Sequence, residues 1–193
     1  CFPENWIPIL NRYSKKFNLI FFFSITSFKS LNIAIKYKIP ILKIASPQFF
    51  GNPWLVEACL KTRKKVILST GLNTFIEIKK KIQNLKRKKL LKNSCILYCE
   101  SKYPLKIEDF DYSKISLYQK TFNLPVGLSD HTLSTVVPAI SVFEGAQVIE
   151  KHITLNRKDI GPDHFFSLEI DDFSEMVKNI RDVEKIITIK QNK

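Results

Sequence analysis

Two short motifs place histidines where buried strands give way to polar residues. His131 lies in the run Gly-Leu-Ser-Asp-His-Thr, and His152 closes the run Val-Ile-Glu-Lys-His. Neutral imidazole is a common ligand of divalent transition metals, and two histidines leave positions for the water and substrate oxygens that Lewis-acid catalysis requires. Either histidine alone could instead hydrogen-bond the end of its strand. As a pair at the ends of neighbouring strands, they predict a metal site.

A lysine within an apolar run is the second chemically unusual feature. Lys43 lies in the run Ile-Leu-Lys-Ile-Ala, where an ammonium group without a partner would be costly. A phosphate or carboxylate ligand would offset that cost, whereas a lysine that extends to the rim of the sheet would need none. Together with the histidines, the lysine and nearby hydroxyls predict an oxyanion ligand. Those hydroxyls follow the apolar runs at Thr26, Ser46, Ser69-Thr70, Ser101, Tyr103 and Ser129.

The spacing of the glycines and the sequence Gly-Pro-Asp-His indicate how a phosphate or a sugar could be bound. The five glycines lie at least 16 residues apart, so neither a G-x-G-x-x-G nor a G-x-x-x-x-G-K phosphate loop can be written. Any phosphate must therefore be held in another way. Asp163, in the turn-like sequence Gly-Pro-Asp-His, could accept hydrogen bonds from a sugar hydroxyl.

Alternating strand and helix patterns must position these residues. Short apolar runs predict strands at 19–25, 41–45, 65–69, 95–99, 125–128 and 147–153. Between them apolar residues recur every three or four positions, as in helices, and Thr74 with Glu77 has the spacing of a capping box. Strands alternating with helices favour a parallel α/β sheet, whose ligands bind at the carboxyl ends of the strands. The candidate polar residues all lie at those ends.

The spacing of the strands suggests how large the sheet is. Successive strands start 22 to 30 residues apart, close to the ~31 residues per unit of a ~250-residue (β/α)8 barrel. Six units are visible, so we expect an α/β fold that is a partial TIM barrel with about six of its eight units. An open doubly wound sheet is the alternative. The start without methionine favours an internal piece of a longer protein.

Composition excludes several classes of protein. The 193 residues are 45% hydrophobic, and 31 Lys and Arg against 18 Asp and Glu give a net charge of +13. No apolar run approaches the ~18 to 20 residues that span a bilayer, and the four cysteines lack C-x-x-C pairing. We therefore expect a cytoplasmic domain with reduced thiols and no membrane contact. The basic run 86–89 lacks interleaved aromatic residues, which favours a solvated helix face over nucleic-acid binding.

Six motifs in order along nearly the whole chain resemble the sialic acid synthase family, whose members make N-acetylneuraminate, legionaminate or pseudaminate. The motifs that contain His131 and His152 are the most specific of the six. Such enzymes are similar to other phosphoenolpyruvate-condensing barrels. The matching stretches are 43–46, 66–71, 98–104, 127–132, 148–152 and 161–164.

This resemblance implies a metal-dependent condensation of phosphoenolpyruvate with the open-chain form of an N-acetylated mannosamine-type sugar. The products would be a nonulosonic acid and free phosphate. His131 and His152 would hold Mn²⁺, with Mg²⁺ or Co²⁺ as alternatives, and the ion would polarise the sugar aldehyde. Lys43, Tyr103 and Asp163 are the implied catalytic residues, with Asp163 orienting the sugar. The implied substrate-binding residues are Thr26, Lys43, Ser46, Gln48, Ser101, Tyr103, Ser129 and Asp163.

The sequence also departs from the family pattern. The pattern K-I-x-S-G-E reads Lys-Ile-Ala-Ser-Pro-Gln here, so Gln48 carries an amide where a carboxylate is expected near the sugar, and sugar preference or activity is left open. The family's first two strands and its C-terminal antifreeze-like domain, which reaches the partner's site in a domain-swapped dimer, have no counterpart in residues 1–193. We expect these residues to form the phosphoenolpyruvate-condensing barrel domain of a longer homodimeric protein, and to be inactive and poorly soluble alone.

Two other interpretations stay open. The first is a phosphoenolpyruvate-dependent synthase on the same barrel that acts on a sugar phosphate; it predicts further basic residues at the strand ends, where only Lys102 and Lys151 occur. The second is a basic, non-catalytic binding domain or decayed gene product, suggested by the charge of +13 and by Gln48. The paired histidines argue against long decay.

Overall fold

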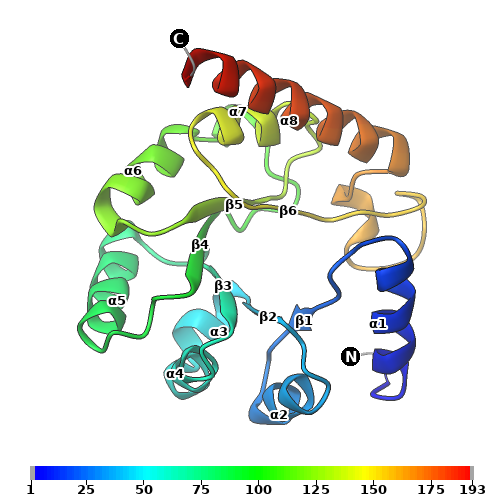
Figure 1. The fold of residues 1–193 in the computed structure, drawn as a ribbon. Helices are drawn as coiled ribbons and strands as arrows, with labels where there is room; N and C mark the ends of the chain where they lie inside the picture. The colour runs from blue at the N-terminus through cyan, green and yellow to red at the C-terminus, as the bar shows by residue number, and fades with distance from the viewer. Residues whose placement is uncertain (1–2, 192–193) are drawn as a thin grey trace. The chain divides into compact units, whose positions relative to one another are not determined.

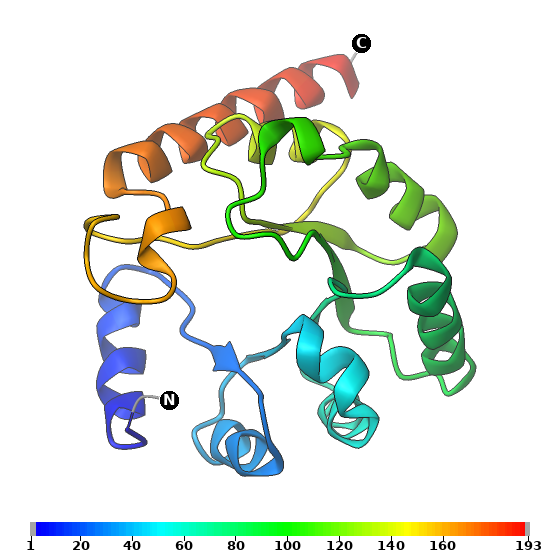
Figure 2. The same ribbon diagram turned by 180° about the vertical axis from the view of Figure 1, so that it is seen from behind.

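The computed structural model describes residues 3–191 of the chain (Figures 1 and 2). Internal contacts divide it into two compact units. The first unit comprises Cys1–Thr70 and Lys80–Cys95, and the second comprises Gly71–Lys79 and Ile96–Lys193. Each unit combines parallel strands with helices, as the alternating sequence pattern predicts.

Three parallel strands organise the first unit. Phe23 of β1 pairs with Leu42 of β2, and Leu42 pairs in turn with Val66 of β3. Helices α2 and α4 lie below these strands in both ribbon views (Figures 1 and 2). The elements are α1 (Trp6–Lys16), β1 (Phe23–Ser24), α2 (Phe28–Lys36), β2 (Ile41–Ile44), α3 (Ser46–Gly51), α4 (Pro53–Lys61) and β3 (Lys65–Ser69).

The second unit is also parallel, with β5 between β4 and β6. Helix α7 packs on β5, and α8 packs on the outside of α7 (Figure 1). Two elements, α5 (Phe75–Arg87) and β4 (Ser94–Cys99), contribute residues to both units. The others are η1 (Ile107–Asp109), α6 (Ser113–Phe122), β5 (Val126–Asp130), α7 (Val137–Phe143), β6 (Ile149–Lys151), η2 (His164–Phe166) and α8 (Ile170–Gln191).

Strand β5 is the most deeply packed strand of the second unit, because all five of its residues are buried. Its glycine is a consequence of this packing. A Cβ atom added at Gly127 would lie 2.2 Å from the carbonyl oxygen of Val148 and 2.7 Å from a methyl carbon of Leu97. Only glycine allows the neighbouring backbone to approach so closely.

The strand predictions are closest for β2, β3 and β4. The prediction at 65–69 matches β3, and the predictions at 41–45 and 95–99 are within one residue of β2 and β4. The prediction at 19–25 is wrong for its first half, since Leu19 and Ile20 are each 63% exposed and only Phe23–Ser24 pairs as a strand. The prediction at 147–153 likewise shortens to Ile149–Lys151.

Strand β5 also corrects the placement of two polar residues. It runs on to Asp130, so Ser129 and Asp130 lie inside the strand rather than just beyond it. The reason is that both side chains find partners on the neighbouring strand, which allows polar residues in a buried strand.

Helix starts follow the expected hydrogen-bond chemistry. The predicted capping box forms, with the Thr74 amide donating to the Glu77 carboxylate at 2.8 Å and the Glu77 amide donating to the Thr74 hydroxyl at 3.3 Å. Helix α2 has a second capping box, built from Ser27 and Ser30. The sequence pattern did not reveal it because serine replaces the usual Glu or Gln at the third helical position.

Among the described residues, Cys59, Cys95 and Cys99 are not joined in disulfides. Burial raises the pKa of Cys59 and of Cys95 to about 11, so both thiols stay protonated near neutral pH. The fourth cysteine, Cys1, lies outside the described residues. Within residues 3–191, no helix is both long enough and apolar enough to cross a bilayer.

Candidate active site

The two histidines of the sequence motifs come from neighbouring strands of the second unit. The register of β5 and β6 pairs Ser129 with Glu150 and Asp130 with Lys151, and the histidine of each motif is the next residue along its chain. The ring centroids of the two histidines lie 5.8 Å apart, with their planes at 58°. The structure therefore brings together the pair that the sequence predicted as a metal site.

His131 is held firmly in one protonation form. It is 4% exposed, and its Nδ1 lies 2.7 Å from the carbonyl oxygen of Glu100. Because a carbonyl oxygen only accepts, Nδ1 carries the proton and Nε2 keeps a free lone pair. Burial lowers the pKa of His131, although the Glu100 hydrogen bond opposes this shift. The ring is therefore a neutral imidazole near neutral pH, as metal ligation requires.

His152 is less enclosed, with 37% of its side chain exposed. Its Nδ1 lies 4.0 Å from a carboxylate oxygen of Asp163, and its ring centroid lies 4.8 Å from that of Phe166. The backbone carbonyl of His152 accepts a hydrogen bond from the Leu168 amide at 3.0 Å. Asp163, predicted to orient a sugar, is thus placed beside the more open of the two histidines.

The donor set of this region fits a divalent transition-metal ion. His131 offers Nε2, and its other nitrogen is fixed by a backbone carbonyl, an arrangement typical of metal-bound histidines. Among the described residues there is no group of three or more His, Cys, Asp and Glu side chains arranged to hold a metal. The two imidazoles are therefore the candidate ligands in this region.

Glu150 joins the histidines on the same face of the strands. Side chains alternate between the two faces of a strand, so Ser129 shares a face with His131, and Glu150 shares a face with His152. The Ser129 hydroxyl donates to the Glu150 carboxylate at 2.7 Å. Glu150 was not among the predicted site residues; its spacing of two from His152 is the signal that could have identified it.

Aromatic rings enclose the histidine pair. The Tyr103 ring lies 4.1 Å from that of His131 and 5.0 Å from that of Phe166, by centroids. Burial raises the pKa of Tyr103, while a hydrogen bond with Ser101 lowers it. Its phenol therefore stays protonated near neutral pH and can donate a hydrogen bond. Phe166, the last residue of the short helix η2, was missed because a single apolar residue carries no distinctive sequence signal.

Lys43 is a buried residue of β2 in the first unit. It is 5% exposed, and its Nζ donates to the Ser69 hydroxyl at 2.7 Å and to the Ile44 carbonyl at 3.3 Å. On β1, Ser24 is its register partner. The structure therefore places the Ser69 hydroxyl against the lysine, with Ser24 as its neighbour on β1.

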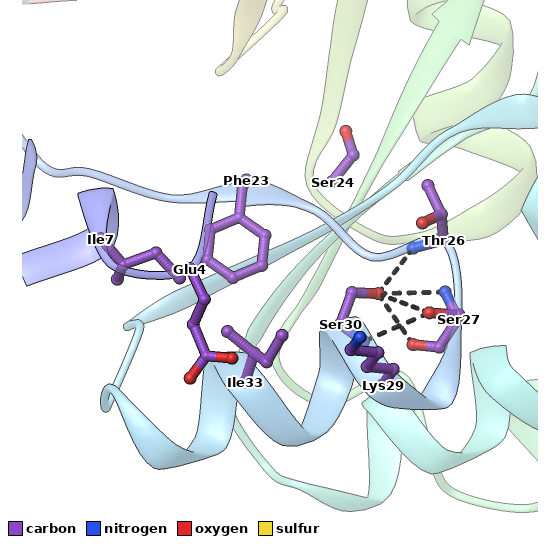
Figure 3. Close-up of a pocket in the computed structure, with 9 residues that line it drawn as sticks. All are labelled: Glu4, Ile7, Phe23, Ser24, Thr26, Ser27, Lys29, Ser30 and Ile33. Atoms are coloured by element: carbon purple, nitrogen blue, oxygen red, sulfur yellow. Dashed lines mark hydrogen bonds between the residues drawn. The ribbon is translucent and has the colours of Figure 1, made fainter. Parts of the chain in front are cut away.

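The remaining predicted residues of the first unit lie on a helix and in a pocket. Ser46 is buried at the start of α3, and Gln48 is half-buried two residues further along that helix. Thr26 is exposed, and its amide donates to the Ser30 hydroxyl at 3.0 Å. Figure 3 shows Thr26, Ser27 and Ser30 gathered at the start of α2, where they line part of a pocket of about 460 Å³.

Comparison with known proteins agrees with the motifs. The family model described as the NeuB family matches residues 1–192. The chain is 41% identical over 182 residues to an uncharacterized protein of Methanocaldococcus jannaschii, an alignment that covers 92% of this chain and 52% of that protein. It is 33% identical over 162 residues to N,N'-diacetyllegionaminic acid synthase of Legionella pneumophila, covering 82% of this chain and 45% of the synthase.

A solved structure extends the likeness to the fold. The N-acetylneuraminic acid synthetase of Leptospira borgpetersenii matches with a TM-score of 0.88 at 32% identity, covering 96% of this chain and 64% of that structure. The predicted α/β fold, a partial (β/α)8 barrel with about six of eight units, is confirmed. The chain spans about half the length of the curated relatives it matches. With its family model matched over almost every residue, and with synthases of sialic-type acids among its relatives, the chain belongs to the NeuB family.

Proposed function

We propose that this protein condenses phosphoenolpyruvate with the open-chain form of an N-acetylated mannosamine-type sugar, forming a nonulosonic acid and releasing phosphate. Family membership supports a synthase of sialic-type acids. The observation that carries the proposal is the histidine pair of β5 and β6, in which the Glu100 carbonyl leaves Nε2 of His131 free to bind a metal.

His131 and His152 would hold the divalent ion, for which Mn²⁺ is our first choice. When bound, such an ion supplies Lewis-acid polarisation of a carbonyl oxygen, here that of the sugar aldehyde. The Glu100 carbonyl keeps the His131 ring in the tautomer and orientation that ligation needs. Tyr103 packs on the His131 ring and Phe166 packs on the His152 ring.

The anionic substrate is assigned to the first unit's lysine. Lys43 would bind the phosphate or carboxylate of phosphoenolpyruvate, and the Ser69 hydroxyl fixes the position of its ammonium group. Ser46 and Thr26 would add hydroxyl donors. In the second unit, Asp163 has 63% of its side chain exposed, so its carboxylate is free to accept hydrogen bonds from sugar hydroxyls.

The sugar-phosphate interpretation is less well supported by the second unit. That interpretation predicts additional basic residues at the strand ends. The two lysines that occur there each already have a carboxylate partner. Lys151 forms an ion pair with Asp130, and Lys102 lies 2.9 Å from a carboxylate oxygen of Asp109. An acceptor without a phosphate group is therefore our first choice.

The direct test measures phosphate release from phosphoenolpyruvate in the presence of Mn²⁺. It uses the whole protein, purified from the organism that makes it. Three acceptors are compared: N-acetylmannosamine, its 6-phosphate and a diacetamido trideoxyhexose. We expect release with an unphosphorylated acceptor and none without a sugar. Release with the phosphorylated sugar alone would favour the sugar-phosphate interpretation, and no release with any acceptor would refute the proposal.

A histidine variant tests the metal assignment separately. His131→Ala should weaken Mn²⁺ binding, measured by electron paramagnetic resonance, by more than the about 10–100-fold typical of losing an outer-shell partner. The matched control is His164→Ala. Nδ1 of His164 lies 2.7 Å from the Thr154 hydroxyl, so this histidine is not one of the proposed metal ligands. Equal Mn²⁺ affinities of the two variants would show that the assignment is wrong.

A further inference from the structure

An ion pair lies inside the second unit, directly beside the histidines. The side chains of Asp130 and Lys151 are 0% and 2% exposed, and Lys151 Nζ donates to Asp130 Oδ2. Alternation along β5 and β6 places this pair on the face opposite to that of the histidines. Lys151 there lines a groove with Val142 of α7 and Met176 of α8. Neither residue of the pair has been assigned a part in the proposed chemistry.

The pair also holds the residue that follows His131. The Thr132 amide donates to Asp130 Oδ1 at 2.9 Å, and the Thr132 hydroxyl donates to Asp130 Oδ2 at 3.2 Å. Lys151 Nζ donates to the Thr132 carbonyl as well. The residues before and after His131 are therefore both bound to the residue that precedes His152.

We propose that Asp130 and Lys151 are positioning residues that set the separation of His131 and His152. Strand β6 has only three residues, and the ion pair joins β5 to β6 at the register position directly before both histidines. The His152 backbone is bonded to Leu168 and its ring packs on Phe166, but neither of those residues belongs to β5. Without the pair, the end of β6 can shift and carry His152 away from His131. The metal-binding part of this inference rests on the proposed function.

The test needs a variant that removes the link without burying a lone charge. Removing only one partner would leave the other charged and unpaired inside the protein, which threatens folding. Asp130→Asn with Lys151→Met avoids this. Asn keeps an acceptor for the Thr132 amide and can donate to the Thr132 hydroxyl, and Met matches the length of Lys. The matched control makes the same changes, Asp182→Asn with Lys185→Met, in an exposed ion pair of α8.

The first readout needs no metal. Nuclear Overhauser contacts between the ring protons of His131 and His152 are recorded in the whole protein with the metal removed. The native centroid separation of 5.8 Å allows such contacts. We expect them to fall at least twofold in the Asp130→Asn, Lys151→Met variant and to stay unchanged in the control. Unchanged contacts in the folded variant would overturn the proposal, whatever happens to metal binding.

The second readout is the affinity for Mn²⁺ of the same proteins. We expect the dissociation constant to rise at least about tenfold in the variant, as for outer-shell residues of metal sites, and less than twofold in the control. Lost ring contacts with an unchanged Mn²⁺ affinity would overturn the link to the metal. If the native protein bound no Mn²⁺ but the ring contacts still depended on the pair, the positioning role would stand and the proposed function would fail.

Discussion

Both units of the molecule bury a lysine on a strand, and the two lysines have different partners. Lys43 of β2 is 5% exposed and donates to the Ser69 hydroxyl and the Ile44 carbonyl. Lys151 of β6 has a side chain that is 2% exposed and donates to the Asp130 carboxylate. Both lie in short runs that read as apolar strands in the sequence.

The comparison shows that burial alone does not assign a role to a lysine. A carboxylate satisfies the hydrogen bonds of an ammonium group and also neutralises its charge, as Asp130 does for Lys151. Lys151 forms an ion pair with Asp130 and so links β6 to β5. Lys43, beside the Ser69 hydroxyl, is the candidate for binding an anionic substrate.

The largest expected effect is on stability, from Lys151→Met alone. The Asp130 carboxylate would stay buried without its partner, so we expect the free energy of unfolding to fall by about 3–5 kcal/mol. Urea denaturation measures the change. Lys185→Met, in an exposed pair of α8, should change stability by no more than about 0.5 kcal/mol. If Lys151→Met lowered stability by no more than the Lys185→Met control does, the ion pair would not be what holds β5 and β6 together.

Glycines offer a second contrast between the units. At Gly127 an added Cβ would meet the Val148 carbonyl oxygen at 2.2 Å, so Gly127→Ala should lower stability by about 1–3 kcal/mol. At Gly51, in α3 of the first unit, a Cβ would meet nothing within 4 Å. Gly51→Ala should therefore be neutral or stabilise by up to about 1 kcal/mol. Thermal unfolding of both variants checks this order, and a larger loss at Gly51 would contradict it.

A third prediction sharpens the role of Lys43. Replacing it with methionine removes a charged hydrogen-bond donor, so the KM for phosphoenolpyruvate should rise about tenfold or more. Mn²⁺ affinity should stay within about twofold, because the proposed metal ligands are the two histidines. Steady-state phosphate release and paramagnetic resonance measure the two quantities. An unchanged KM would remove Lys43 from the proposed substrate site.

The smallest effect concerns an ion pair of the first unit. The Lys88 ammonium group donates to Glu57 and lowers the pKa of that carboxyl group. The unfolded chain then binds the proton more tightly, so the pair stabilises the fold above the ordinary glutamate pKa, about 4.3, and the benefit is lost as pH falls through the lowered value. Glu57→Gln should remove this part of the acid dependence in urea unfolding between about pH 6 and pH 3. An unchanged pH profile would contradict it.

The sequence predicted the structure best where a local pattern of residues is compatible with a single local structure. The run 65–69 became β3, and Thr74 with Glu77 formed the capping box, because both depend on neighbours in the chain. The pairing of His131 with His152 was also predictable, since parallel strands that follow each other in the chain bring their ends together. The strand prediction failed at residues 19–22 because an apolar run does not reveal whether another part of the protein will pack against it.

Several parts of the candidate site could not be read from the sequence. Glu100 contributes its backbone carbonyl to His131, a role that any residue type at that position could fill. Phe166 packs on His152 from the short helix η2, which follows β6 in the chain. The motifs that contain Ser129 and Asp130 did not show that one side chain faces the histidines and the other lies with Lys151 on the opposite face.

The sequence by itself determined the alternation of strands and helices, the motifs that carry the histidines and the lysine, and through them the family. These features are set by residue types and by periods of two and 3.6 residues, which are local properties of the chain. The tertiary structure alone decided the partners of each polar group: Ser69 for Lys43, Asp130 for Lys151, and the Glu100 carbonyl for His131. The physical reason is that these contacts join residues 21 to 31 positions apart, and only the register of the folded strands brings them within hydrogen-bond distance.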